Sequence, residues 1–124
     1  MMTSLRLHEV ILYVQNMNAQ VTFYRDVLGL ELTDPSALKS PDELHWVTFK
    51  TGECTLALHS GGKGQFGSDA PRFVLLVDDL QNWERKLADL GVQVSEIRSV
   101  APHVEVLDVV DPEGIHFSLE SIRT

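Results

Sequence analysis

The sequence predicts an α+β fold made of two βαβββ modules. The main observation is a repeated segment, because EVILYVQNM (residues 9–17) is similar to RFVLLVDDL (residues 72–80). Each copy is followed by a helical pattern, a glycine and three strand-like segments. A fixed order of elements that occurs twice indicates two copies of one supersecondary unit. With 124 residues, of which 44% are hydrophobic, the chain suits one domain with its own core.

The first module begins with a strand-like run from Val10 to Val14, followed by Asn16, a residue type that favours the helix N-cap. The apolar residues after it share one helical face, which is Met17, Val21, Tyr24 and Leu28. Gly29 is expected to end the helix. Three strand candidates follow, LELT (30–33), HWVTFKTG (45–52) and CTLALHS (54–60).

The second module repeats this order, from the strand-like run Phe73 to Val77 to the N-cap candidate Asp79. Its expected helical face is Leu80, Trp83, Leu87 and Leu90, ended by Gly91. The strand candidates are VQVSEI (92–97), VEVLDVV (104–110) and IHFSLES (115–121). Between the last two, the tetrapeptide DPEG (111–114) fits a type I turn and predicts a hairpin.

Glycines in GGKGQFGSDAP indicate a flexible connection between the modules. We therefore expect a single domain over residues 1–124, divided into module one (5–60), a glycine-rich linker (61–71) and module two (72–122). The single Cys54 excludes an internal disulfide framework. A net charge of −8 disfavours nucleic acid as a partner, and the chain has neither a membrane-length apolar run nor an export signal. A cytoplasmic location is the resulting expectation.

The first strand of each module has one apolar face for the helix to cover, with Val10, Leu12 and Val14 in one copy and Phe73, Leu75 and Val77 in the other. The opposite faces hold Glu9, Ile11 and Tyr13, and Arg72, Val74 and Leu76. These faces are too apolar for simple exposure to water. We expect them to line a concave binding cleft with Glu9 and Arg72 as its charged points, rimmed by the polar segment 33–44.

Three stretches resemble the vicinal oxygen chelate superfamily, which includes glyoxalase I, extradiol dioxygenases, and fosfomycin and bleomycin resistance proteins. They are FYRDVLGLEL (23–32), VDDL (77–80) and DPEGIHFSLE (111–120). The resemblance covers nearly the whole chain. It implies mixed sheets that curve around a cleft where two modules meet, and a homodimer.

In metal-dependent proteins that this sequence resembles, three metal-ligand positions correspond here to Glu9, Arg72 and Ser118. A permanent cation and a hydroxyl are poor substitutes for the usual histidine and glutamate. The resemblance therefore implies a broken metal triad. Glu9 and Arg72 could form an ion pair that holds the module interface, or they could contact a ligand, and both readings stay open.

A rearranged metal site is an alternative. The period of two places His116, Ser118 and Glu120 on one strand face, and Thr55, Ala57 and His59 on another. If those faces meet, Glu9, His59, His116 and Glu120 offer suitable ligands for a divalent metal. His45 and His103 lie near expected strand starts, where surface roles are expected.

The leading hypothesis is a metal-independent, cofactor-free protein that sequesters a small, partly apolar molecule in the cleft between the modules. The expected cleft residues are Glu9, Ile11, Tyr13, His59, Arg72, Val74, His116, Ser118 and Glu120. The competing hypothesis is a metal-dependent lyase, isomerase or ring-cleaving dioxygenase with a displaced ligand set. A third reading makes Glu9 a base that acts on a carbon acid. The sequence assigns no catalytic residue.

Overall fold

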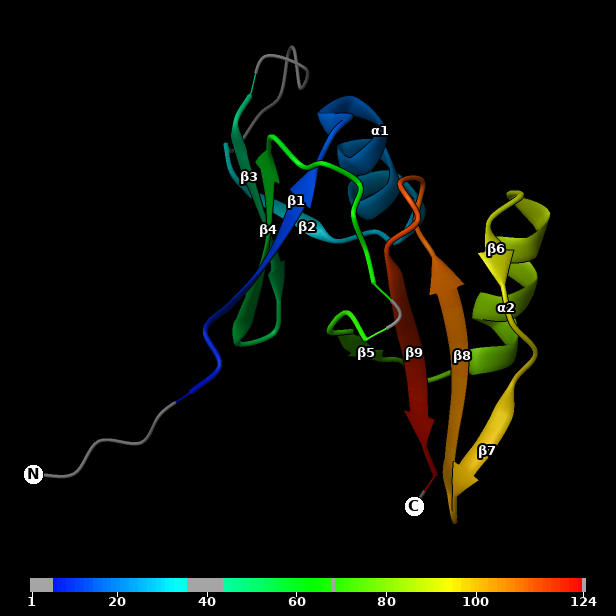
Figure 1. Cartoon of the computed structure of the whole chain (residues 1–124). Helices are drawn as coiled ribbons and strands as arrows, with labels where there is room; N and C mark the ends of the chain where they lie inside the picture. The colour runs from blue at the N-terminus through cyan, green and yellow to red at the C-terminus, as the bar shows by residue number, and fades with distance from the viewer. Residues whose placement is uncertain (1–5, 36–43, 68, 124) are drawn as a thin grey trace, which may run out of the picture. The chain divides into compact units, whose positions relative to one another are not determined.

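The computed structural model describes residues 6–35, 44–67 and 69–123. The chain forms two compact units, Met1–Gln65 and Phe66–Thr124. Their boundary falls inside the glycine-rich segment expected to link the modules. Each unit has one mixed sheet together with helical structure (Figure 1), so the predicted α+β class is confirmed.

The first unit contains, in order, β1 (Glu9–Val14), α1 (Met17–Val21), the π-helical segment η1 (Thr22–Val27), β2 (Glu31–Asp34), β3 (Trp46–Thr51) and β4 (Cys54–Ser60). The strand order across the sheet is β1-β4-β3-β2. The first strand is parallel to the last, whereas β3 is antiparallel to both of its neighbours. The strand that pairs with β1 is therefore β4, which is the last strand of this unit in the sequence.

The helical segment of this unit begins and ends where the sequence predicts. The Asn16 side chain accepts a hydrogen bond from the Ala19 backbone N–H at 3.0 Å, which caps α1. All four residues of the expected apolar face are buried. The segment ends with Gly29 at a φ of 79°. The Tyr24 ring packs against Phe49, with 6.4 Å between ring centroids, and so joins η1 to β3 in one core.

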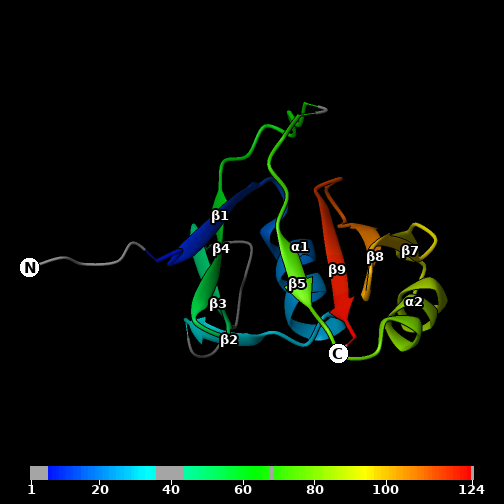
Figure 2. The same ribbon diagram turned by 90° about the horizontal axis from the view of Figure 1, so that it is seen from below.

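The second unit contains β5 (Val74–Leu76), α2 (Leu80–Asp89), β6 (Gln93–Val94), β7 (Arg98–Ala101), β8 (Val104–Val110) and β9 (His116–Ile122). Its strand order is β5-β9-β8-β6, and β7 also pairs with β8. As in the first unit, the first strand is parallel to the last. Figure 2 shows α2 beside β8, consistent with its contacts to β6, β8 and β9.

The strand predicted over residues 92–97 is confirmed only at Gln93–Val94, which form β6. A second short strand that was not expected, β7, follows after residue 97, and the two pair with opposite ends of β8. The break lies at Ser95. Its hydroxyl accepts a hydrogen bond from the Asp108 backbone N–H at 2.9 Å, and its own N–H donates to the Asp108 carbonyl at 2.9 Å. A side-chain hydroxyl thus replaces a backbone carbonyl in the ladder and interrupts the strand.

Helix α2 is capped as predicted, since the Asp79 carboxylate accepts from the Asn82 N–H at 3.1 Å. Leu80 and Leu87 are buried. Leu90, expected on the same face, is instead 57% exposed because it lies beyond the last helical residue, Asp89. Trp83 is half-buried, with the Lys86 ammonium 4.6 Å from its ring centroid.

The predicted hairpin between β8 and β9 is confirmed. The Gly114 N–H donates to the Asp111 carbonyl at 3.0 Å. The buried Asp111 side chain also accepts from the N–H groups of Glu113 and Ile115, at 2.9 and 3.0 Å. These bonds fix the turn, and β9 brings Phe117 into the core, where it stacks on Phe73. In the described part of the chain, no helix is both long and apolar enough to cross a membrane.

Candidate binding faces

In the first unit, one sheet face leaves apolar side chains of β1 open to solvent. Ile11 is 41% and Tyr13 is 56% exposed. The strand register places Tyr13 beside His59, and His59 beside Trp46, so these three aromatic rings form a row across β1, β4 and β3. Ring centroids are 5.1 Å apart for Tyr13 and His59, and 6.0 Å apart for His59 and Trp46. The row offers a continuous surface against which a ring or chain could pack.

The hydrogen bonding of His59 determines its tautomer. Its Nδ1 atom lies 2.6 Å from the backbone carbonyl oxygen of Ser60. A carbonyl oxygen only accepts hydrogen bonds, so Nδ1 must carry the proton. In the neutral ring, Nε2 then holds the free lone pair, which can accept a proton or bind a metal ion.

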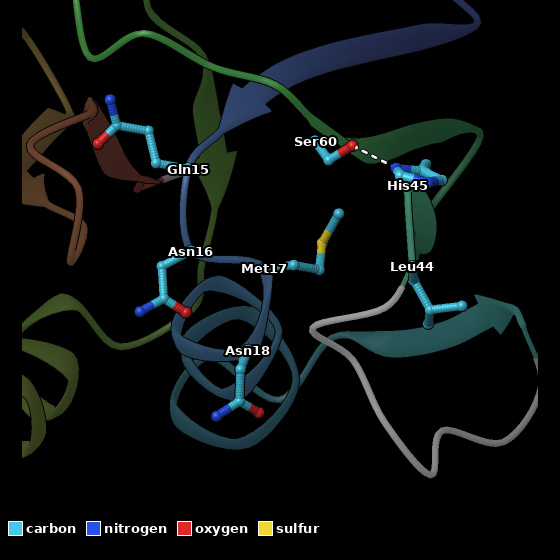
Figure 3. A pocket seen from close by; sticks show the side chains of 7 residues that line it. All are labelled: Gln15, Asn16, Met17, Asn18, Leu44, His45 and Ser60. Carbon is cyan, nitrogen blue, oxygen red and sulfur yellow. Dashed lines mark hydrogen bonds between the residues drawn. The ribbon is translucent and has the colours of Figure 1, made fainter.

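A pocket of about 460 Å³ lies where β1 and β4 end (Figure 3). Its lining is mainly polar and consists of Gln15, Asn16, Met17, Asn18, Leu44, His45 and Ser60. The His45 Nδ1 atom and the Ser60 hydroxyl are hydrogen-bonded at 2.9 Å, and the Ser60 N–H donates to the His45 carbonyl at 3.0 Å. His45, expected to have a surface role, is exposed and also lines this open pocket, whose volume suits a small molecule.

In the second unit, the sheet face of Arg72 is also partly apolar and open. Val74 is 54% and Leu76 is 70% exposed. Val74 pairs with Ser118, and Leu76 pairs with Glu120, on β9. Alternation along β9 places His116 on this face as well. The second unit thus gathers five of the expected site residues on one sheet face: Arg72, Val74, His116, Ser118 and Glu120.

At the centre of this face, the Asp108 carboxylate is held by three hydrogen bonds. The Ser118 hydroxyl donates to Oδ1 at 2.9 Å, and two guanidinium nitrogens of Arg98 donate to Oδ2 and Oδ1 at 2.6 and 3.4 Å. The bonds from Arg98 lower the pKa of Asp108 most, burial opposes them, and Ser118 and the charges of Arg98 and Arg72 lower it further. Asp108 is therefore a preorganised, ionised carboxylate.

The residues of the alternative metal set do not gather within either unit. In the strand register Glu9 is opposite Thr55, and His59 is opposite Tyr13. Glu9 and His59 are therefore four residues apart along the strands, or about 13 Å. His116 and Glu120 have the same spacing along β9. Among the described residues of each unit, no three His, Cys, Asp or Glu side chains lie where they could hold a metal ion. Within single units, the donor sets that the structure describes therefore do not fit a metal.

Some expectations concern other regions. Two expectations involve residues of different units and therefore stay predictions. They are that the two sheet faces converge in a cleft and that Glu9 pairs with Arg72. Residues 36–43, the central part of the expected rim, lie outside the described residues.

Sequence reasoning missed Arg98 and Asp108, as well as the pocket beside His45. One signal for Asp108 was present, because it is the only charged residue on the strand face that it shares with Val104, Val106 and Val110. A lone carboxylate among valines indicates a specific partner. Nothing in the sequence identified Arg98 as that partner.

The lowered pKa of Asp108 predicts a pH-dependent contribution to stability. Because the folded-state pKa lies below the ordinary value of 3.8, this contribution is complete above that value and is lost as the pH falls through the folded-state pKa. Asp108→Asn should therefore lower the urea midpoint more at about pH 6 than at about pH 2.5. The control, Gln81→Ala at an exposed position of α2, neither adds nor removes a titratable group and should change the midpoint equally at both pH values. An equal loss for Asp108→Asn at both pH values would contradict the prediction.

Solved structures with this fold include proteins of several functions. Lactoylglutathione lyase from Agrobacterium tumefaciens is 23% identical, with a TM-score of 0.72, over 96% of this chain and 95% of the other. The fosfomycin resistance protein FosX from Listeria monocytogenes is 15% identical, with a TM-score of 0.72, over 99% and 96%. The antibiotic binding protein TnmS3 from Streptomyces is 19% identical, with a TM-score of 0.72, over 99% and 100%. At these identities, the likeness shows the fold alone.

No curated protein matches this chain. A family model does match, over residues 6–119, and it describes the Glyoxalase/Bleomycin resistance protein/Dioxygenase superfamily. The match covers most of the chain and agrees with the resemblance found in the sequence. The chain therefore belongs to the glyoxalase, bleomycin resistance protein and dioxygenase superfamily.

Proposed function

We propose that this protein binds a small, partly apolar molecule without the help of a metal ion. The observation that carries the proposal is the exposure of apolar side chains on one sheet face of each unit: Ile11 and Tyr13 on β1, and Val74 and Leu76 on β5. Burying these side chains against a ligand would be favourable, at about 25 cal/mol for each Å² of apolar surface removed from water. Polar groups next to them would orient the ligand.

The chemistry of the second face supports metal-independent binding. Ser118 occupies a position where the resemblance implies a metal-binding glutamate, and its hydroxyl donates to Asp108. The Asp108 carboxylate is in turn engaged by Arg98. Both carboxylate oxygens therefore already have partners, and the nearby Arg72 adds a second positive charge that would repel a divalent cation.

One observation favours the alternative of a metal-dependent lyase, isomerase or dioxygenase. The hydrogen bond from His59 Nδ1 to the Ser60 carbonyl presents Nε2 in the form that metal-binding histidines use. In that case, ligands from both units would have to meet at His59.

Metal analysis distinguishes the two functions. Untagged, gently purified protein should contain far less than one transition-metal ion per chain by plasma mass spectrometry. Added manganese, nickel, zinc or ferrous iron should leave its melting temperature unchanged, whereas some partly apolar small molecules in a thermal-shift screen should raise it. A stoichiometric metal that is lost in His59→Gln, but retained in a His103→Gln control, would overturn the proposal.

A further proposal concerns the oligomeric state of the protein. Superfamily members often form dimers, and we propose that this chain forms a homodimer. Light scattering after size exclusion would then give twice the mass of one chain. The cytoplasmic location stays a prediction.

A further inference from the structure

We infer that Arg72 and Arg98 recognise an anionic head group, a carboxylate or a phosphate, on a ligand whose apolar part packs against Val74 and Leu76. This inference rests on the proposed function, because it names the class of ligand that the second face would bind.

The Arg98 side chain is oriented by its bonds to Asp108 and keeps other donors for a ligand. Arginine has five N–H donors, and the two hydrogen bonds to Asp108 leave three of them for other acceptors. The Arg98 side chain is half-exposed, so these donors are accessible. Because Asp108 is itself fixed by Ser118 and by the backbone bonds to Ser95, little ordering would be needed for Arg98 to bind an anion.

The charge of Arg72 acts on the same carboxylate from the opposite end of the strand order, on the same sheet face. Arg72 lies just before β5, whereas Arg98 lies on β7, and β9 and β8 run between them. The Ser118 N–H donates to the Phe73 carbonyl at 3.1 Å, which places Arg72 beside the row that contains Ser118 and Asp108. Within its own unit, the described residues give the exposed Arg72 side chain no hydrogen bond or ion pair, although its charge acts on Asp108.

The local charge opposes the charge of the whole protein. Arg98 binds the Asp108 carboxylate and the charge of Arg72 acts on it, so these three side chains together are net positive, whereas the chain carries −8. Glu120 pairs with Leu76 and with Val106, and Val106 also pairs with Arg98, so Glu120 offsets part of this positive charge at the Leu76 end of the face. A positive cluster on an acidic protein is suited to bind an anion at one place rather than over the whole surface.

The apolar side chains are adjacent to this cluster. Val74 pairs directly with Ser118, which bonds to Asp108, and Leu76 follows on the same face. A head group at the arginines would therefore leave a short hydrocarbon chain or ring over Val74 and Leu76. A ligand with one anionic end and one apolar end matches this arrangement.

Four probes with the same eight-carbon chain test the inference: octanoate, octyl phosphate, 1-octanol and octylammonium. Binding is measured at low salt from the amide NMR shifts of Val74 and Leu76. At least one of the two anions should bind about tenfold more tightly than octanol, and the better anion identifies the preferred head group. Octylammonium should bind no more tightly than octanol at these residues, even though the net charge of the protein favours cations.

Variants then assign the preference to the arginines. Arg72→Gln and Arg98→Gln should each remove most of the anion preference while octanol binding persists. Arg85→Gln, an equal loss of charge on α2, should preserve it. Because Arg98→Gln also frees Asp108, Arg72→Gln is the decisive variant, with its unfolding midpoint measured in parallel.

The outcomes separate this inference from the function on which it rests. Equal binding of octanol and both anions, or an anion preference that survives in Arg72→Gln, would overturn the inference and leave the apolar binding face intact. If none of the four probes shifts Val74 or Leu76, the proposed binding at this face fails as well.

Discussion

Replacement of Phe117 with alanine is expected to lower the free energy of unfolding by about 3–5 kcal/mol. Phe117 is completely buried and stacks on Phe73, with 4.9 Å between ring centroids and 5° between ring planes. The substitution removes the apolar surface of the ring from the core and leaves a cavity beside β9. The stacking contact with Phe73 is lost as well. Urea unfolding followed by circular dichroism measures the change.

A matched control is Phe66→Ala, which removes the same ring from a position where it is 41% exposed. Its cost should be about 1 kcal/mol or less, because far less contact is lost. Similar losses for the two variants would show that the Phe117 ring is not the centre of the core in the second unit.

Replacement of Gly62 with alanine is expected to cost about 1–3 kcal/mol. An added Cβ atom would lie 2.5 Å from the carbonyl oxygen of Tyr13 and 2.7 Å from the backbone nitrogen of Val14. These backbone atoms are fixed by the pairing of β1 with β4, so they cannot move aside as a side chain would. The Gly62 N–H also donates to the Val14 carbonyl at 3.0 Å, a bond that the displaced backbone would lose.

Gly67→Ala provides the control for this effect, because nothing lies within 4 Å of the position that its Cβ would occupy. It should change the free energy of unfolding by less than about 0.5 kcal/mol. If Gly62→Ala were equally neutral, residue 62 would belong to a flexible linker and would not be packed against β1.

Features that depend on neighbouring residues could be predicted from the sequence. The caps Asn16 and Asp79 and the turn at Asp111 all bond to backbone groups only a few residues away. The apolar face of the first helix also follows directly from its spacing. Local chemistry and periodicity therefore sufficed for the α+β class and for most elements.

Features that depend on contacts between distant residues could not be predicted. The break at Ser95 requires the backbone of Asp108, and the role of Asp108 requires Arg98 on another strand. Gly62 was expected in a flexible linker because glycine is common there, yet it lies against β1. Alternation correctly placed Val74, Ser118 and Glu120 on one strand face, but it did not reveal the ion pair of Arg98 and Asp108 on that face.

The pairing of the first strand with the last in each unit affects how the protein is made. On the ribosome, β1 emerges early, but its partner β4 is synthesised only after α1, η1, β2 and β3. Until then, Ile11 and Tyr13 belong to a strand that has no neighbour in its own sheet. In the second unit, β5 likewise has no neighbour until β9 has been synthesised. Slower translation of β4 and β9 should therefore prolong the time during which these apolar strands can aggregate in the nascent chain.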